Sequence, residues 1–385
     1  MAGMNRRELL QLGAATVAAG VVPRPAWAQA SAAPPSGSAT TTASGNASVA
    51  RIRIDAYSRT LHWLRKPEEI AEACHQIGNT TIDLTVRTYP GHVDPAKVTT
   101  DLPPFVKALE RGGITVTSIA AEITDDQTPN VDAILGTMSS LGIRHHWWRG
   151  FSFNATQPYR DQVEALKPRI ERLVKLEAKY GTKAMYHPGG GPYFDILDFL
   201  RNFDPRYVSV HYDTGHWLQV SQANMAAHLR LGAAYIGGFV WKDELVEKVD
   251  PATADTAGRA TGAADNAADP AQTAAAGRGG RAGAAGAAAG AGRGGGGGRG
   301  GGSVNGFRTR QVPVGTGMVD FALAARTLKE INFDGPTECQ PEWTGLGGAE
   351  SGRDTLTLPR ETVIGLLKRD YETIHTALVA AGAAG

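Results

Sequence analysis

Short apolar runs alternate with longer amphipathic stretches over most of the chain, from Arg51 to Leu378. The short runs have the length of strands, whereas the longer stretches repeat apolar residues at helical spacing. Eight strands are predicted, at Ile52–Tyr57, Thr81–Val86, Ile114–Glu122, Ile143–Trp148, Lys183–His187, Tyr207–Tyr212, Ala234–Trp241 and Gly335–Gln340. Helices are predicted between them, for example at Pro67–Ile77, Asp101–Arg111, Asp161–Tyr180 and Asp320–Ile331.

This alternation predicts an α/β fold with a parallel sheet, because strand–helix–strand units join parallel strands by right-handed crossovers. Eight such units favour a closed (β/α)8 barrel, a TIM barrel, over an open sheet. A dinucleotide-binding sheet is disfavoured, since Asp55-Ala-Tyr-Ser-Arg59 follows the first strand in place of a glycine-rich phosphate loop. We therefore predict one barrel domain over residues 50–385.

Three segments fall outside the predicted core. Residues 1–30 contain Arg6-Arg7, a short apolar stretch and small residues around Ala28, which is typical of a twin-arginine signal peptide. We expect export to the periplasm or beyond, with an ordinary amphipathic helix as the alternative. Residues 31–49 and the Ala/Gly/Arg-rich insert 250–304 are expected to be disordered, since they have few large apolar side chains to bury. The insert follows the seventh predicted strand.

Composition narrows the range of partners. The formal net charge is +1, which predicts no general attraction to nucleic acid or to an anionic membrane. No stretch is long and apolar enough for a permanent membrane anchor. The arginines of the insert allow an RNA-binding alternative, but they are sparse and accompanied by no aromatics, so a passive insertion is favoured. Cys74 and Cys339 form no disulfide framework, and the sequence leaves their pairing open.

Polar side chains gather where the predicted strands end, which is the side on which barrel enzymes carry their catalytic groups. Histidines at strand ends or in the following loops are His62, His92, His145, His146, His187, His211 and His216. Arg87, Glu122, Trp147 and Trp148 also lie at strand ends and are expected to wall a site. Any one of these histidines is more often structural or in contact with substrate than a metal ligand.

The sixth strand carries the sharpest pattern. Alternation places His211 and Asp213 on one face, and Gly215 lets the chain turn His216 back over the same opening. An Asp and a His in this position can bind a divalent metal or sugar hydroxyls. The alternative is a helix-capping Asp followed by a surface His.

In the eighth strand, alternation places Glu338, Gln340 and Glu342 on one face and Thr337 and Cys339 on the other. Burying two carboxylates is costly unless they are paired or bound to a cation, so the pattern favours a functional role. A shifted register that turns the carboxylates outward is the alternative.

Two further strand ends carry candidates. His187 ends the fifth strand and precedes Gly189-Gly-Gly191, which permits close approach of a ligand. Lys242-Asp243 ends the seventh strand. Lys242 is expected to neutralise a substrate oxygen, and a plain surface pair between Lys242 and Asp243 remains open.

Together these residues resemble the xylose-isomerase-like barrel family, which includes proteins labelled sugar phosphate isomerase/epimerase. The resemblance is carried by Tyr212-Asp213-Thr-Gly-His216, Trp241-Lys242-Asp243, Pro313-Val-Gly-Thr-Gly-Met-Val-Asp-Phe321 and Phe333-Asp-Gly-Pro336. Family members commonly hold a divalent cation with Glu, Asp, His and Glu after strands five to eight. Asp213 and the neighbouring His216 match the second position. The other three positions depart from the pattern and hold His187 (or Tyr186), Val240 and Gln340, with Glu342 two residues beyond.

The resemblance implies a sugar or keto-sugar isomerase, epimerase or related lyase, and hence a carbohydrate ligand. Mn²⁺ or Mg²⁺, with Zn²⁺ as another choice, is expected to stabilise an enediolate. The expected metal ligands are Asp213, His187, His216 and Glu342. The expected catalytic residues are Glu342 as the base, Lys242 and His187. Substrate contacts are expected from His216, His211, Arg87, His92, Trp148, Glu122 and Gln340.

Three alternatives remain open at this stage. The first is a carbohydrate-binding barrel that has lost catalysis, and the second is a nuclease of the endonuclease IV type. The third is acid/base catalysis without metal by Glu342 and His187. Assembly into a homo-oligomer is compatible with all of these.

Overall fold

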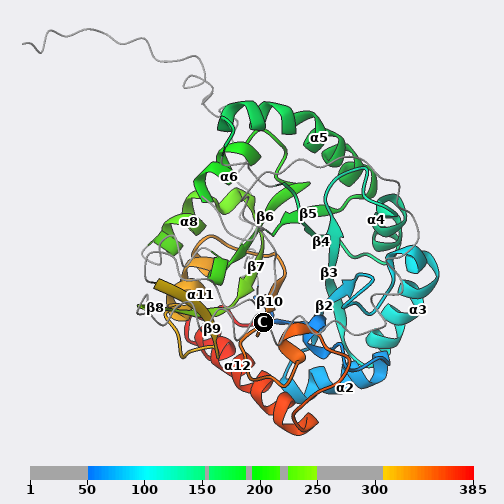
Figure 1. Ribbon diagram of the computed structural model, residues 1–385, viewed down its shortest axis with the longest axis vertical. Coiled ribbons are helices and arrows are strands. Elements are labelled where there is room, and N and C mark those ends of the chain that lie inside the picture. The colour runs from blue at the N-terminus through cyan, green and yellow to red at the C-terminus, as the bar shows by residue number, and fades with distance from the viewer. Residues whose placement is uncertain (1–50, 152–155, 188–192, 217–223, 249–306) are drawn as a thin grey trace, which may run out of the picture. The chain divides into compact units, whose positions relative to one another are not determined.

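Eight parallel strands close into a barrel in the computed structural model, in the order β1-β10-β7-β6-β5-β4-β3-β2 (Figure 1). The structure describes residues 51–151, 156–187, 193–216, 224–248 and 307–385. The barrel strands are β1 Asp55–Tyr57, β2 Thr81–Val86, β3 Thr115–Ile123, β4 His145–Trp148, β5 Lys183–Tyr186, β6 Val208–Asp213, β7 Ile236–Trp241 and β10 Thr337–Cys339. Every predicted strand overlaps one of these, and the predicted (β/α)8 barrel is confirmed.

Helices surround the strands on the outside of the barrel (Figure 1). They are α2 Pro67–Ile77, α3 Val98–Arg111, α4 Val131–Ser140, α5 Tyr159–Tyr180, α6 Tyr193–Leu200, α8 Met225–Leu231, α11 Phe321–Glu330 and α12 Arg360–Ala380. Short 3-10 helices occur at η2 Ser58–Leu61, η3 Pro95–Lys97, η5 Ala233–Tyr235 and η6 Ala349–Ser351. Helix α2 has its predicted bounds, since Pro67 suits a first turn and Gly78, at φ 118°, ends the helix.

The predicted signal peptide 1–30, the linker 31–49 and the insert 250–304 lie outside the described residues, as do the glycines 189–191. Within the described part of the chain, no helix combines the length and the apolar character needed to cross a bilayer.

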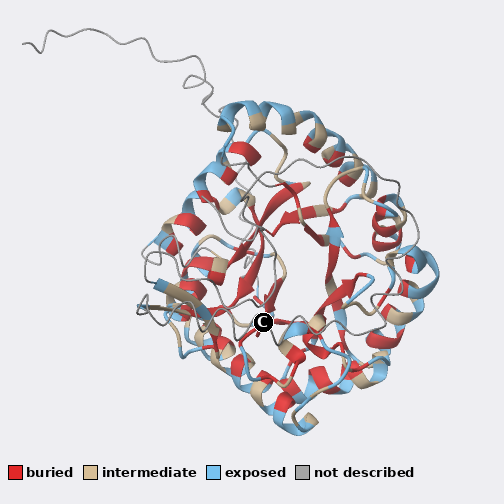
Figure 2. Cartoon of the chain, viewed as in Figure 1, coloured by how far each residue is buried: buried red, intermediate tan, exposed pale blue. Residues whose placement is uncertain are grey.

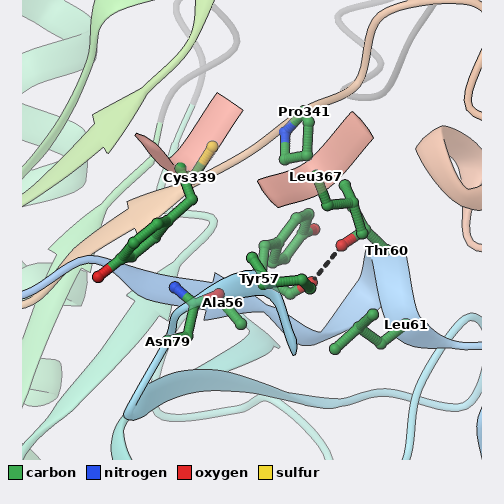
Figure 3. Close-up of a pocket in the computed structure, with 10 residues that line it drawn as sticks. Ala56, Tyr57, Thr60, Leu61, Asn79, Cys339, Pro341 and Leu367 are labelled. Carbon is green, nitrogen blue, oxygen red and sulfur yellow. Dashed lines mark hydrogen bonds between the residues drawn. The ribbon is translucent and has the colours of Figure 1, made fainter. Parts of the chain in front are cut away.

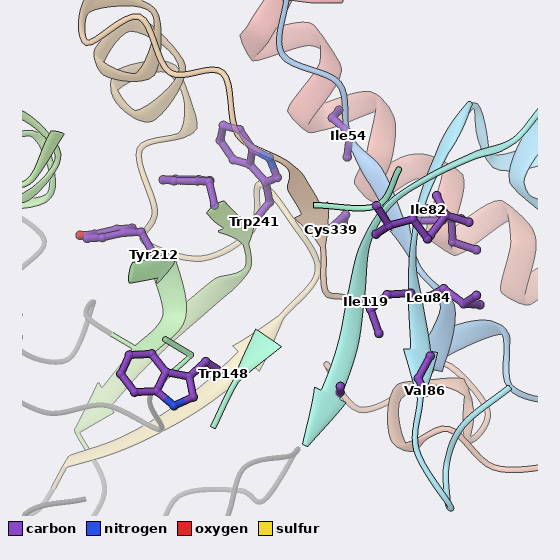
Figure 4. Close-up of a cluster of buried hydrophobic side chains, with 14 of the residues drawn as sticks. Ile54, Ile82, Leu84, Val86, Ile119, Trp148, Tyr212, Trp241 and Cys339 are labelled. Carbon is purple, nitrogen blue, oxygen red and sulfur yellow. The ribbon is translucent and has the colours of Figure 1, made fainter. Parts of the chain in front are cut away.

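The apolar core lies between the strands and the helices. Ile82, Leu84 and Val86 of β2 are fully buried and belong to one large cluster with the inner faces of the helices (Figure 4). Figure 2 shows the same division, with buried residues on the strands and exposed residues on the outer helix faces. Burying one such side chain contributes about 1.5 to 3 kcal/mol, so this layer supplies the main stabilisation.

The strand face that lines the barrel interior is more polar than the strand face that packs against the helices. Buried Asp83 and Glu338 point inward from β2 and β10, where Ser118 donates to Asp83 over 2.6 Å and Gln340 donates to Glu338. Burial, together with repulsion from Asp83, raises the pKa of Glu338 well above its ordinary value. The inward face predicted for Glu338 and Gln340 is therefore confirmed.

A hairpin that the sequence did not predict follows the seventh barrel strand. Strands β8 Asp243–Lys248 and β9 Phe307–Val312 pair antiparallel, with Lys248 opposite Phe307. Because these two residues flank segment 249–306, the insert leaves and re-enters the fold at one place. Its predicted position after the seventh strand is confirmed.

Cys74 and Cys339 are both buried and free, so they do not pair with each other. Cys339 lines a small cavity between β1, β10 and the helices α2 and α12, together with Tyr57 and Leu367 (Figure 3). The cavity measures about 20 Å³, enough for about one water molecule. It lies in the helix-facing layer and is too small for a sugar, so the candidate chemistry has to be sought at the strand ends.

Candidate active site

The ends of β5, β6, β7 and β10 bring the sharpest sequence candidates into one buried cluster. Lys242 Nζ lies 3.0 Å from Asp213 Oδ2 and 3.0 Å from Glu342 Oε2. His187 Nε2 lies 3.7 Å from the same oxygen of Asp213. The convergence follows from the barrel, because parallel strands deliver their carboxyl ends to one rim.

Asp213 is held by its own loop. Its Oδ1 accepts the backbone N–H groups of Gly215 at 2.8 Å and His216 at 3.2 Å, and its Oδ2 lies 3.4 Å from His216 Nδ1. Burial alone would raise the pKa of Asp213, but the positive charges of His216 and Lys242 outweigh it and lower the pKa. Asp213 is therefore an ionised carboxylate, and Gly215 turns His216 back over it as the sequence predicted.

His187, Asp213 and His216 form a group that could hold a metal ion. One ligand atom from each lies within 4.8 Å of the others. Nδ1 of His187 is buried without a hydrogen-bond partner among the described residues. Burial is the largest of the causes that keep the pKa of His187 well below its ordinary value, so the ring is neutral, the form that binds a metal. These residues fit a divalent cation.

Glu342 does not complete that group, although the sequence placed it there. Its carboxylate pairs with Lys242 and accepts a hydrogen bond from Arg59. Burial alone would raise the pKa of Glu342, but Lys242 and Arg59 lower it. Burial would likewise lower the pKa of Lys242, and the two carboxylates raise it instead. Charges thus alternate along Asp213, Lys242, Glu342 and Arg59.

Lys242 and Asp243 do not form the surface pair that the sequence left open. Both are buried, and Asp243 accepts backbone N–H groups from Gly315 at 2.9 Å, Gly317 at 2.8 Å and Val319 at 3.1 Å. A Cβ at residue 317 would lie 2.3 Å from the Asp243 carboxylate, so this turn requires glycine. The turn Gly315-Thr-Gly317 therefore binds a carboxylate of its own chain and anchors the strand end that presents Lys242.

Aromatic rings form one wall of the cluster. Trp147 stacks on His187 with 4.2 Å between ring centroids and on Tyr57 with 5.4 Å. The guanidinium of Arg87 lies 4.9 Å from the centroid of the same indole. His211 lies behind His187, with 5.1 Å between their rings. Burial lowers the pKa of His211 to about 3, so this ring is neutral as well.

Comparison with known proteins agrees with this architecture. The family described as the xylose isomerase-like TIM barrel matches residues 57–360. The chain belongs to this family. Among curated proteins, no sequence relative of this family member is found.

Solved structures of similar fold include an L-ribulose 3-epimerase, with a TM-score of 0.52 and 14% identity over 86% of this chain and 96% of that one. A xylose isomerase-like TIM barrel protein from Mycobacterium smegmatis in complex with magnesium has a TM-score of 0.51 and 15% identity over 86% and 97%. A 3-keto-D-glucoside 4-epimerase from E. coli has a TM-score of 0.50 and 12% identity over 82% of this chain and 98% of that one. At these identities the likeness establishes the fold.

Two expected substrate contacts of this family member lie elsewhere. Trp148 packs against Phe151 and Tyr186 in the helix-facing layer, with its indole N–H donated to Thr124. Neighbouring residues of a strand face opposite sides, so Trp147 and not Trp148 faces the interior. His92 also lies apart from the cluster, since its Nδ1 lies 3.0 Å from Thr85 Oγ1 and its ring packs near Phe105 of α3.

Of the other expected contacts, Glu122 is exposed at the end of β3, and Gln340 is buried beside Glu338. Arg59 is a site residue that sequence reasoning missed. It follows β1, and its position two residues past a strand end was the available signal.

Proposed function

We propose that this barrel is an isomerase, epimerase or related lyase of sugars or keto-sugars that removes a proton beside a carbonyl group. The observation that carries the proposal is the buried Lys242 ammonium, 3.0 Å from each of the Asp213 and Glu342 carboxylates. The epimerases of similar fold named above support the same class of reaction.

Glu342 is the proposed base. Because Lys242 and Arg59 keep it ionised, it can accept the proton of a C–H bond next to a substrate carbonyl. The C–H electron pair then forms a C=C bond, and the carbonyl oxygen takes the negative charge. Lys242 stays protonated and neutralises that oxygen.

The fate of the enediolate decides the product. Return of the proton to the other carbon gives an isomer, and return to the opposite face gives an epimer. Loss of a β-substituent gives a lyase product. His187 lies in the same cluster, 3.7 Å from Asp213, and its neutral ring can form a hydrogen bond with a substrate hydroxyl group.

A divalent cation would be held by His187, Asp213 and His216. Two imidazole nitrogens and one carboxylate oxygen suit Zn²⁺ or Mn²⁺ better than Mg²⁺, which prefers oxygen ligands. Such a cation, when bound, polarises the substrate carbonyl. Lys242 shares Oδ2 of Asp213 with this group, so its ammonium would turn toward Glu342 and the substrate oxygen.

Deuterium exchange tests the proposal directly. The purified full-length protein is incubated with keto-sugars in D₂O, and the reaction is followed by NMR. The measurement is made with protein loaded with Mn²⁺, with protein loaded with Zn²⁺, and with protein treated with a chelator. We expect exchange at the carbon beside the carbonyl, together with conversion to an isomer or epimer. A folded, metal-loaded protein that exchanges no proton of any keto-sugar would contradict the proposal.

Two matched substitutions assign the chemistry to this cluster. Lys242→Met removes the buried charge and is expected to slow exchange about 100- to 1000-fold. Lys179→Met removes an exposed lysine of α5, whose partner is Asp132 on the outer surface, and is expected to leave exchange unchanged. Equal rates in the two variants would remove Lys242 from the reaction.

A carbohydrate-binding barrel without catalysis is a second candidate, favoured by one observation. Lys242 pairs with Oδ2 of Asp213, where a bound metal would otherwise supply the positive charge. This candidate predicts saturable sugar binding without deuterium exchange and without retained metal, which the same experiment measures.

We also propose that the protein is exported, with residues 1–30 as its signal peptide. Cell fractionation of the full chain and of a variant with Arg6→Lys and Arg7→Lys tests this. Retention of the variant inside the cell is the expected result, and equal export of both chains would contradict it.

A further inference from the structure

We propose that the substrate of this barrel carries an anionic group, a carboxylate or a phosphate, and that Arg87 binds it. The proposal rests on the function proposed above, because it names the substrate class of the same site. It starts from a buried guanidinium that forms no ion pair with a carboxylate among the described residues.

Arg87 follows β2 and has 9% of its surface exposed. Its Nε donates to the backbone oxygen of Ala120 over 3.1 Å, and its guanidinium lies over Trp147. Nη2 is buried and has no hydrogen-bond partner among the residues that the structure describes. The contact with the indole face uses the charge of the guanidinium but none of its N–H groups.

Two carboxylates lie near Arg87, yet neither forms an ion pair with it. Asp83 lies four residues earlier on the same inward face of β2, where its Oδ1 accepts from Ser118. Glu122 lies on the neighbouring strand, one residue beyond the Val86–Ala121 pair, and is exposed. Arg59, at the next strand end, shows the contrast, since Glu342 accepts its hydrogen bond.

A buried charge without a counter-ion is unfavourable unless a ligand supplies one. The guanidinium offers parallel N–H donors that match the oxygens of a carboxylate or phosphate. Arg87 thus has the chemistry and an unpaired donor of an anion site.

An anion bound by Arg87 would lie close to the catalytic cluster, because both contact Trp147. Arg87 and His187 both contact the indole of Trp147, with 4.9 Å from the guanidinium carbon and 4.2 Å from the imidazole to the ring centroid. A sugar held at its charged end by Arg87 can therefore extend its carbon chain along Trp147 toward His187, Asp213 and Lys242. The substrate class that follows is a sugar acid or a sugar phosphate.

Calorimetric titration of the full-length protein tests this with matched ligands. The ligands are glucose, glucuronate and glucose 6-phosphate, which differ in the charged group. We expect one of the two anions to bind at least about 10-fold tighter than glucose, and the tighter one identifies the source of the charge. Arg87→Gln is expected to weaken that anion about 10- to 100-fold and glucose less than about 2-fold.

Two further variants keep the test decisive if Arg87→Gln folds poorly. Arg87→Lys keeps the charge but loses the paired donors, and we expect intermediate affinity for the anion. Glu122→Gln is expected to leave anion affinity unchanged or to raise it, because it removes a nearby like charge. A loss of anion affinity in Glu122→Gln as large as in Arg87→Gln would overturn the proposal, as would equal binding of all three ligands.

Deuterium exchange separates this proposal from the function that it extends. Exchange of neutral keto-sugars, combined with an anion affinity that Arg87→Gln leaves unchanged, would overturn the anion site and leave the isomerase function standing. Anion binding that depends on Arg87 without any proton exchange would support the site and contradict the isomerase function. Absence of binding by any sugar would overturn both.

Discussion

Two buried pairs of histidine and carboxylate, His146–Glu177 and His187–Asp213, involve the neighbouring strands β4 and β5 and differ in how completely their hydrogen-bonding atoms are satisfied. His146 lies on the helix-facing side of β4, and its Nε2 lies 2.9 Å from Glu177 Oε1 of α5. His187 follows β5 on the interior side, and its Nε2 lies 3.7 Å from Asp213.

The His146–Glu177 pair uses all of its polar atoms. His146 Nδ1 lies 2.8 Å from the Trp147 backbone oxygen, and Thr182 donates to the second oxygen of Glu177 over 2.5 Å. Nδ1 of His187 has no hydrogen-bond partner within the described part of the chain. A saturated pair has no position left for a ligand, whereas an unsaturated one does. The comparison identifies the first pair as structural and the second as the place where a metal or substrate can bind.

The largest effect that tests this comparison is the loss of stability in Glu177→Ala. Removing one partner of a buried ion pair costs about 3 to 5 kcal/mol, because His146 would stay buried without its acceptor. Urea unfolding measures the change. The folded fraction should keep its metal content and its deuterium exchange, and a variant as stable as the wild type would break the comparison.

Asp213→Asn is expected to lose activity and to keep most of its stability, the reverse of Glu177→Ala. Exchange should fall about 100- to 1000-fold and metal retention should be lost, because a neutral amide is a poor ligand and no longer pairs with Lys242. Its amide oxygen can still accept the backbone N–H groups of Gly215 and His216. Stability should therefore fall less than in Glu177→Ala, and a larger loss would show that Asp213 serves the fold first.

The smallest effect concerns pH. Burial lowers the pKa of His146, but the charge of Glu177 outweighs burial and raises the pKa above the ordinary value of 6.5. The folded protein thus holds a proton that the unfolded chain releases at lower pH. The stabilisation that protonated His146 gives the folded protein is complete below about pH 6.5 and is lost as the pH rises through the folded-state pKa.

Glu177→Gln should remove this contribution. Its stability deficit relative to the wild type should be larger near pH 6 than near pH 9, because the stabilisation by protonated His146 is lost as the pH rises through its raised pKa. Urea unfolding at both pH values measures it. A deficit that grows toward alkaline pH would reverse the sign and contradict a charged His146.

The barrel strands could be predicted because their signal is local. Strand β2 was predicted with its observed bounds, since Ile82, Leu84 and Val86 alternate with polar residues and all lie in the helix-facing core. The hairpin of β8 and β9 could not be predicted. Its strands are separated by segment 249–306, and only their pairing in space makes them strands.

The candidate site divides in the same way. His187, Asp213 and Glu342 could be brought together from the sequence, because strand ends of a closed barrel share one rim. Arg59 could not be assigned, since its role depends on meeting Glu342, a residue from the far end of the chain.

The sequence by itself therefore determined the periodicity, the order of strands and helices, and which residues end the strands. Tertiary structure alone decided that Lys242 bridges Asp213 and Glu342, that Trp147 and not Trp148 faces the interior, and that Arg87 lacks a carboxylate partner among the described residues. The physical reason is that periodicity is a property of neighbours along the chain. Ion pairing depends on distances of a few ångströms between side chains from different strands, which exist only once the barrel has closed.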